Sequence, residues 1–201
     1  ADTRLFRPPE REGPREGLVW IGNWGDEERS AELETFLFRP AAAAGLALDV
    51  YGVRYPEHAL ATLAEHGVRY NGWLPNARAP EAFAWHLATV HVPRRFYTTV
   101  LPGVPTIRVF EALACGIPLA SAPWDDAEGL YRPGTDYLVA RDGAEMERRL
   151  AALRDDPALR ASLAASGLER IRERHTCAHR VDELLGIVAG LRMPTREGAH
   201  A

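Results

Sequence analysis

The sequence has no lysine, only two cysteines and no long uncharged apolar run among its 201 residues. A membrane-spanning helix needs about 20 consecutive apolar residues, so no membrane span is predicted. No basic segment followed by an apolar one marks a secretory signal. All 24 basic residues are arginine, which we attribute to coding bias rather than to a function for each side chain.

The two cysteines, Cys115 and Cys177, lie far apart and form no CxxC pair. They predict no disulfide framework, and free thiols indicate a cytoplasmic location. The formal net charge of −4 argues against nucleic acid as a partner. Hydrophobic residues make up 46% of the chain, enough for a folded core. The first residue is not methionine, which predicts a processed or excised piece of a longer protein.

Three regions differ in composition. Residues 1–17 combine proline, glycine and charge without apolar periodicity, so we expect a linker or an N-terminal arm. Residues 18–192 alternate short apolar segments with helical patterns and are expected to form one domain. Residues 193–201 form a polar tail.

Six short apolar segments of this domain predict β-strands: residues 18–21, 46–51, 68–71, 89–92, 117–120 and 137–140. Helical patterns cover residues 26–44, 57–66, 80–88, 105–115 and, as a short helix, 125–131. From residue 143 onward the pattern is helical only, with breaks at 155–157 and 166–167. This alternation predicts an α/β fold: a Rossmann-like, doubly wound parallel sheet of about six strands with a helical C-terminal segment.

The segment PGVPTIRVFEALACGIP, residues 102–118, carries the strongest functional signal. A loop rich in glycine and proline leads directly into a helix, whose free N–H groups form an anion site at the ligand-binding edge of a parallel sheet. Arg108 could close over a phosphate there, and Glu111 could accept hydrogen bonds from two neighbouring sugar hydroxyls. The alternative is an ordinary helix that covers the sheet and leaves Glu111 in solvent.

Within this segment, FEALACGIPL at 110–119 resembles the EAMACGxPVV signature of group 1 glycosyltransferases of the GT-B fold, in their C-terminal, donor-binding domain. Four further segments are similar to the spore-maturation (CgeB-type) glycosyltransferase-like proteins: IGNW at 21–24, YNGWLPN at 70–76, HVPRR at 91–95 and HTCAHR at 175–180. The resemblance covers about residues 18–190. It implies one half of a GT-B fold that binds a nucleotide-diphosphate sugar, with UDP as the expected nucleotide.

In that family a glutamate holds the ribose hydroxyls, and it falls on Glu111. Relatives often carry an earlier glutamate that faces the donor sugar, whereas this chain has Gly103 at that position. The loop with Gly103, Val104 and Thr106 could still offer backbone amides to a diphosphate or a hexose. Because GT-B enzymes do not require a metal, arginines and helix N-termini are expected to stabilise the leaving diphosphate.

Arg94 and Arg95 follow a predicted strand and are the first candidates for that charge, although they could instead cap a surface loop. Arg29 and Arg54 are weaker candidates. Further donor contacts are expected in the turn after the first strand, which lacks the GxGxxG spacing, and after the third strand, where the resemblance implies the nucleobase. These residues are Gly22, Asn23 and Trp24 in the first turn, and Gly72, Trp73, Leu74 and Asn76 in the second.

Alternatives remain for these turns. Trp73 could stack on a base or be an apolar residue at the rim, and Asn76 ends a segment that is also typical of a turn. His91 lies at a strand end, but no sequence feature supports a catalytic role, and no catalytic residue is assigned.

Two groups of polar residues are interpreted as structural. The acids Asp125, Asp126 and Glu128 are expected to cap and open the short predicted helix. The spacing of His175, Cys177 and His179 resembles that of metal ligands, but no second cluster accompanies it, so no metal site is predicted.

These observations predict a donor-binding domain that serves metal-independent, retaining hexosyl transfer to an unknown acceptor. The expected partner is an N-terminal acceptor-binding domain of the same enzyme, without which the chain binds donor but does not turn it over. The alternatives are a degenerate, non-catalytic glycosyltransferase-like module and, less strongly, a sugar-nucleotide epimerase of the same fold.

Overall fold

The computed structural model describes residues 1–10, 13–25 and 28–191. Six parallel strands form one sheet in the order β3-β2-β1-β4-β5-β6. Their bounds are β1 Leu18–Ile21, β2 Leu48–Tyr51, β3 Arg69–Tyr70, β4 Ala88–His91, β5 Leu119–Ser121 and β6 Leu138–Val139. The chain winds outward from β1 in one direction and from β4 in the other, so these adjacent strands form the switch point of a doubly wound sheet. The predicted fold class is confirmed.

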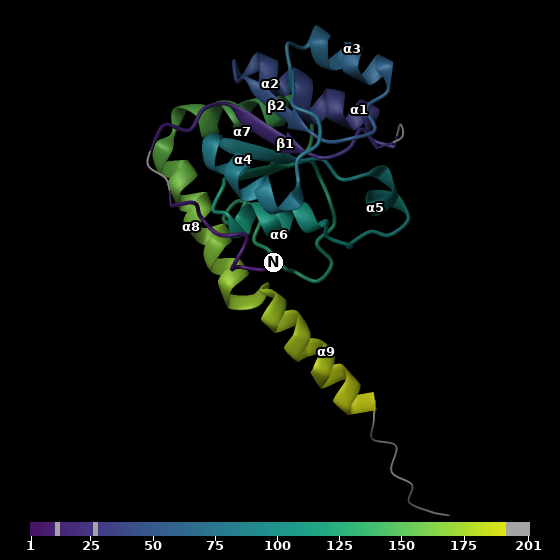
Figure 1. The fold of residues 1–201 in the computed structure, drawn as a ribbon, viewed down its shortest axis with the longest axis vertical. Helices are drawn as coiled ribbons and strands as arrows, with labels where there is room; N and C mark the ends of the chain where they lie inside the picture. Colours follow the sequence, from purple (N-terminus) through teal and green to yellow (C-terminus); the bar gives the residue numbers. More distant parts are fainter. Residues whose placement is uncertain (11–12, 26–27, 192–201) are drawn as a thin grey trace, which may run out of the picture.

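Helices flank the sheet on both faces (Figure 1). In chain order they are α1 Ser30–Leu33, the π-helical η1 Glu34–Phe38, α2 Arg39–Ala43, α3 Glu57–Glu65, the 3₁₀ turn η2 Asn76–Arg78, α4 Ala79–Trp85, α5 Arg95–Thr99, α6 Ile107–Ala114, α7 Gly143–Asp155, α8 Pro157–Arg174 and α9 Cys177–Leu191. Because α1, η1 and α2 follow one another without a break, they form one helical segment with a π-helical middle.

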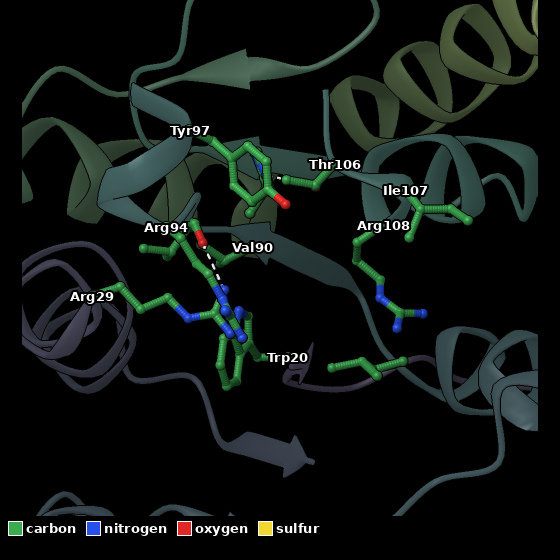
Figure 2. A pocket seen from close by; sticks show the side chains of 11 residues that line it. Trp20, Arg29, Val90, Arg94, Tyr97, Thr106, Ile107 and Arg108 are labelled. Carbon is green, nitrogen blue, oxygen red and sulfur yellow. Dashed lines mark hydrogen bonds between the residues drawn. The ribbon is translucent and has the colours of Figure 1, made fainter. Parts of the chain in front are cut away.

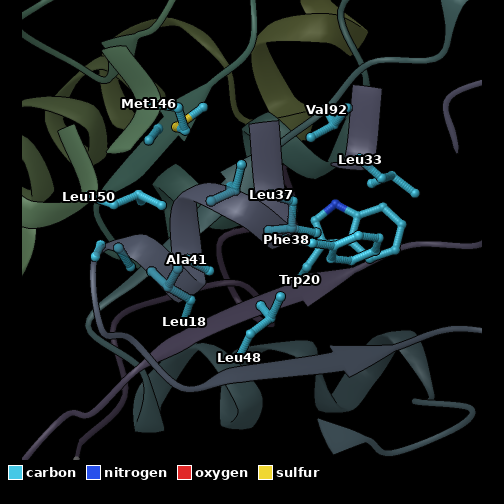
Figure 3. Close-up of a cluster of buried hydrophobic side chains, with 14 of the residues drawn as sticks. Leu18, Trp20, Leu33, Leu37, Phe38, Ala41, Leu48, Val92, Met146 and Leu150 are labelled. Carbon is cyan, nitrogen blue, oxygen red and sulfur yellow. The ribbon is translucent and has the colours of Figure 1, made fainter. Parts of the chain in front are cut away.

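Alternation along β1 divides the core in two. Leu18 and Trp20 lie in one hydrophobic cluster, together with residues of α2, α3 and α7. Figure 3 shows Ala41 of α2 and Met146 of α7 in this cluster. Val19 lies in the second cluster, with residues of α4, α6 and α8. Side chains of successive strand residues point to opposite faces, so a buried parallel strand supplies both clusters.

The N-terminal residues contribute to this second cluster. Phe6 is buried within it, and the Ala1 carbonyl accepts a hydrogen bond from the Cys177 backbone N–H at 2.9 Å. Glu16 donates its backbone N–H to the Trp85 carbonyl at 3.0 Å. The described part of residues 1–17 therefore packs on the domain.

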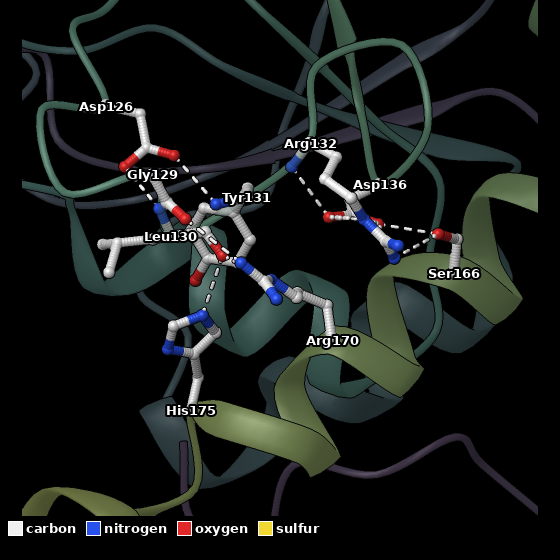
Figure 4. Close-up of polar contacts among 9 residues, drawn as sticks. All are labelled: Asp126, Gly129, Leu130, Tyr131, Arg132, Asp136, Ser166, Arg170 and His175. Carbon is white, nitrogen blue, oxygen red and sulfur yellow. Dashed lines mark hydrogen bonds and ion pairs between the residues drawn. The ribbon is translucent and has the colours of Figure 1, made fainter.

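The carboxylates of Asp126 and Asp136 hold the loop between β5 and β6 in place by accepting hydrogen bonds (Figure 4). Asp126 accepts hydrogen bonds from the backbone N–H groups of Leu130 and Tyr131 at 2.9 and 2.8 Å. The predicted helix over 125–131 is absent, because this carboxylate holds the backbone in a turn that competes with helix formation. Asp136 is anchored to α8 through the Ser166 hydroxyl at 2.6 Å.

One other expectation about helices is wrong, and one helix was not expected. α8 continues through Ser166 and Gly167, where a break was predicted. Gly167 serves close packing instead, since a Cβ there would lie 2.7 Å from the Leu113 side chain of α6. The short helix α5 was not predicted. The break at 155–157 is confirmed, because Asp156 caps α8 by accepting from the Leu159 backbone N–H at 2.9 Å.

Helix α9 projects from the body of the domain, and none of its residues is buried (Figure 1). Across the described residues, no helix combines the length and apolarity needed to cross a membrane. The predicted polar tail at 193–201 lies outside the described residues.

Candidate functional site

A cavity of about 210 Å³ opens at the carboxyl ends of β1 and β4, beside the first turn of α6. It therefore lies at the switch point, where doubly wound sheets bind ligands. Its walls carry three arginines, Arg29, Arg94 and Arg108. Figure 2 shows Arg29 and Arg94 entering from one side and Arg108 from the other. The remaining lining residues are Trp20, Ile21, Val90, His91, Val92, Tyr97, Thr106 and Ile107.

Arg29 is partly buried and pairs with no carboxylate of the described residues. Its guanidinium donates to the Val92 carbonyl at 3.2 Å and to the Asn23 carbonyl, and it lies 4.9 Å from the centre of the Trp20 ring. The Nε atom is buried without a hydrogen-bond partner. Burial, and then repulsion from Arg94, lower the pKa of Arg29 to about 10, so the group stays charged at neutral pH. A cation held only by carbonyl dipoles and a ring favours an anionic ligand.

The other two arginines are only partly neutralised. Arg94 lies 3.7 Å from a Glu28 carboxylate oxygen, a long ion pair at the protein surface. Arg108 pairs with Glu111 at 2.6 Å, and burial lowers the pKa of its guanidinium. Three guanidinium groups facing one cavity give it a positive potential.

The first turn of α6 adds to that potential. Thr106 occupies the N-cap position with an extended backbone, and no acidic residue lies in the first turn. The first N–H groups of a helix have no partner within the helix, and its dipole places partial positive charge there. Backbone and side chains thus favour an anion at the same place.

Glu111, the predicted ribose ligand, is buried beside this turn with 2% of its surface exposed. Its two carboxylate oxygens accept hydrogen bonds from Asn76 at 2.9 Å and from Arg108 at 2.6 Å. The structure therefore brings together three predicted site residues from two segments. Both carboxylate oxygens of Glu111, the expected acceptors of the ribose hydroxyls, therefore have a partner within the chain.

Below the cavity, His91 joins Thr106 to β5. Its Nε2 lies 2.9 Å from the Thr106 hydroxyl and its Nδ1 lies 2.9 Å from the Ser121 hydroxyl. Burial, together with nearby Arg29, lowers the pKa of His91 to about 3, so the ring is neutral at physiological pH. The geometry connects the histidine to the α6 N-cap.

Several predicted contacts lie elsewhere. Arg95 forms a two-point ion pair with Glu32 at 3.0 and 3.1 Å and does not line the cavity. Trp24 is buried in the core against Phe38, so it has a packing role. The Asn23 side chain accepts a hydrogen bond from the Val53 backbone N–H at 3.1 Å.

The remaining candidates lie in loops and turns and do not line the cavity. Trp73 is 72% exposed and Val104 is also exposed, whereas Leu74 packs on the second core cluster. Gly72 has φ +70°, and its carbonyl accepts from the backbone N–H of Gly52. Gly22 serves close packing, since a Cβ there would lie 2.8 Å from the Trp20 ring, and its carbonyl accepts from the Tyr55 hydroxyl at 2.9 Å.

The backbone conformation and packing at Gly103 explain why this position departs from the family pattern. Its φ of +87° belongs to the left-handed region that favours glycine. A Cβ there would also lie 2.8 Å from the Ala127 Cβ. A glutamate at this position is incompatible with the loop as it stands.

Within the described ranges, no group of three or more His, Cys, Asp or Glu side chains is arranged to hold a metal ion. His175 and His179 do not share a helix: His175 ends α8 and its Nε2 lies 2.9 Å from the Leu130 carbonyl. His175 thus has the structural role that was expected (Figure 4).

The sequence reasoning underrated Arg29 and missed Trp20 and Tyr97. Arg29 lies eight residues after β1, just before α1, and a helix start after the first strand was the available signal. The two aromatic residues carry no signal of their own, since a strand tryptophan is usually a core residue.

The switch-point cavity and the strand order define a Rossmann-like domain of the kind found in GT-B glycosyltransferases. The sequence matches the family described as glycosyl transferase-like over residues 29–186, so the chain belongs to that family. No curated protein matches the sequence.

Solved structures share the fold. The C-terminal domain of the group 1 glycosyl transferase LpcC from Francisella tularensis superposes with a TM-score of 0.67 at 14% identity, covering 88% of this chain and 99% of that one. For T4 phage β-glucosyltransferase the TM-score is 0.72 at 14% identity, with 94% of this chain and 54% of that one covered. For S. aureus TarM it is 0.70 at 12% identity, with 91% and 37% covered.

The chain therefore spans about half the length of the phage enzyme and little more than a third of TarM. The phage enzyme has been solved with UDP and Mn²⁺, and TarM with UDP. Identities this low establish the shared fold alone.

Proposed function

We propose that this chain is the donor-binding half of a GT-B glycosyltransferase and binds a nucleotide-diphosphate sugar at the β1–β4 switch point. The observation that carries the proposal is the partly buried Arg29, which faces the cavity and has no carboxylate partner among the residues that the structure describes. A diphosphate supplies the negative charge that this site lacks. Family membership and the UDP bound by solved neighbours support the choice of ligand.

Each part of the donor has a candidate partner. The diphosphate lies between Arg29, Arg94 and the first N–H groups of α6. There the same charges stabilise the departing nucleoside diphosphate. As Arg108 turns toward the phosphates, Glu111 becomes free to accept hydrogen bonds from the ribose hydroxyls. A carboxylate has capacity for about four hydrogen bonds, so Asn76 can keep its contact.

The base and the acceptor fall outside the cavity. Residues 72–76 lie in the turn after β3, where the exposed Trp73 is available to stack on a base. The cavity, about 210 Å³, is smaller than a typical small-molecule pocket of roughly 300–1,000 Å³. This fits a half-site that an N-terminal acceptor-binding domain completes. Hexosyl transfer with retention and without a metal, and membership of the CgeB-type subgroup, belong to the same proposal.

A second function, that of a non-catalytic module, is favoured by one observation. Gly103 cannot be replaced by the usual glutamate without rearranging its loop, so the chain lacks one of the two family carboxylates. Such a module could keep the fold without binding donor.

Calorimetric titration separates the two functions. We expect saturable binding of at least one of UDP, GDP, ADP and dTDP, and no binding of the corresponding nucleosides, because the phosphates supply the charge. Val53→Ala is a suitable control, since this exposed side chain does not line the cavity. Absence of saturable heat with every diphosphate would contradict the proposal and favour the non-catalytic module.

A further inference from the structure

A chain of hydrogen bonds below the cavity fixes the direction of one hydroxyl proton. The Ser121 hydroxyl lies 2.7 Å from the Ala122 carbonyl. A carbonyl oxygen only accepts, so the single proton of Ser121 is used in this bond. The Ser121 oxygen must therefore accept in its other contact, which is with His91 Nδ1 at 2.9 Å.

The tautomer of His91 follows from that contact. Nδ1 carries the proton, and the ring is neutral because it is buried, with 4% of its surface exposed. A neutral imidazole has one protonated nitrogen, so Nε2 carries only a lone pair. It accepts the hydroxyl proton of Thr106, whose Oγ1 lies 2.9 Å away. The lowered pKa of His91 agrees with this state.

Thr106 consequently has no proton left for the cavity that it lines. Its hydroxyl does not cap α6 either, since the N-cap makes no side-chain hydrogen bond to the helix backbone. Thr106 Oγ1 therefore offers a ligand in the cavity only a lone pair. Figure 2 shows Thr106 among the residues that line the cavity. A phosphate oxygen cannot bind there, because both atoms are acceptors, whereas a sugar hydroxyl can donate to it.

We propose that Thr106 Oγ1 is a specificity-determining acceptor for a hydroxyl of the donor sugar, and that His91 and Ser121 are positioning residues that keep its proton turned away. This inference rests on the proposed donor site and assigns separate groups to the two parts of the donor. The arginines and the α6 N-terminus bind the diphosphate, and Thr106 Oγ1 accepts a hydrogen bond from the sugar.

The test compares two probes, UDP and UDP-glucose, on the 201-residue chain by calorimetry. Thr106→Val keeps the shape but removes the oxygen. We expect it to weaken UDP-glucose by about tenfold and to leave UDP within about twofold, the scale of one lost hydrogen bond. Thr106→Ser keeps the hydroxyl and is expected to retain the preference for UDP-glucose.

Ser121→Ala tests the positioning role, because Ser121 is buried and does not line the cavity. Without its acceptor, His91 can carry the proton on Nε2 and donate to Thr106, whose own proton then turns toward the ligand. We expect the gain in affinity from UDP to UDP-glucose to shrink although Thr106 is intact. A merely structural role would change both ligands equally, and thermal melting checks that the variants are folded.

The outcomes separate the two proposals. If none of UDP, GDP, ADP and dTDP binds to the unmodified chain, the proposed function fails. If UDP binds but UDP-glucose binds no tighter, or if Thr106→Val weakens both ligands equally, the donor site stands and the role of Thr106 is wrong. An unchanged preference in Ser121→Ala contradicts the positioning by His91.

Discussion

Two charged groups in this domain are satisfied in different ways. Asp136 is fully buried and accepts hydrogen bonds from the Arg132 backbone and guanidinium and from the Ser166 hydroxyl (Figure 4). Arg29 is partly buried and, within the described ranges, donates only to backbone carbonyls. The first arrangement is complete within the chain and holds a loop on α8. In the second, no described carboxylate neutralises the charge, as expected of a binding site.

Glu111 lies between these extremes. It is nearly as buried as Asp136, but among the described residues its donors are two side chains and no backbone N–H, and one of them, Arg108, also lines the cavity. The contrast indicates that the kind of partner, rather than burial alone, distinguishes a structural carboxylate from one available to a ligand.

At neutral pH the largest effect on stability is expected at Asp136, whose hydrogen-bond donors all belong to the chain itself. Asp136→Ala should lower the free energy of unfolding by about 2–3 kcal/mol, because Arg132 and Ser166 lose a buried charged acceptor that holds the loop on α8. Chemical denaturation measures this loss, and UDP binding should not change. Asp155→Ala is the matched control, since its exposed ion pair with Arg154 is expected to contribute nothing measurable. Equal stabilities of the two variants would contradict a structural role for Asp136.

A smaller effect is expected at Glu111. Glu111→Gln keeps the shape and should weaken UDP by about 1–2 kcal/mol, because a charged acceptor of the ribose hydroxyls is lost. The comparison with 2′-deoxy-UDP sharpens the result. The unmodified chain should prefer UDP over the deoxy form, and the variant should lose that preference. If both proteins discriminate equally, Glu111 does not hold the ribose.

A different effect is expected away from neutral pH, in the pH dependence of stability. The pKa of His91 is lowered to about 3 by burial, whereas an unfolded histidine titrates near about 6.5. Between these values the unfolded chain binds one more proton, so the folded state loses stability as the pH falls, by about 1.4 kcal/mol per pH unit.

His91→Asn should remove this contribution. Unfolding free energies measured between pH 6 and pH 4 should then depend less steeply on pH than in the unmodified chain. An unchanged slope would show that His91 is not held neutral in the fold.

Most of the fold could be predicted from the sequence because short strands between glycine turns have a clear periodicity. All six strands were expected, and β1 within its observed bounds. The helix predicted at 125–131 failed because the backbone there bonds to Asp126, a local competition that composition does not show. The helix break predicted at Gly167 was wrong because the small size of this residue allows close packing and does not form a turn.

The candidate site could be predicted only in part. Glu111, Arg108 and Asn76 were named, and the fold brings them together from positions 35 and 32 residues apart. Arg29 and the Ser121–His91–Thr106 chain depend on which strands are neighbours and on hydrogen-bond distances. Arg95 was expected at the cavity, but its bond to Glu32 depends on a side chain 63 residues away. Such pairings are set by tertiary structure.

The most direct test of the account pairs two measurements on Arg29→Met, which keeps the apolar stem and removes the charge. We predict that UDP affinity falls at least tenfold, about 1.4 kcal/mol, while the free energy of unfolding stays the same or rises, because no carboxylate in the described part of the chain loses a partner. Unchanged UDP affinity in a folded Arg29→Met chain would contradict the claim that this arginine is kept for a diphosphate.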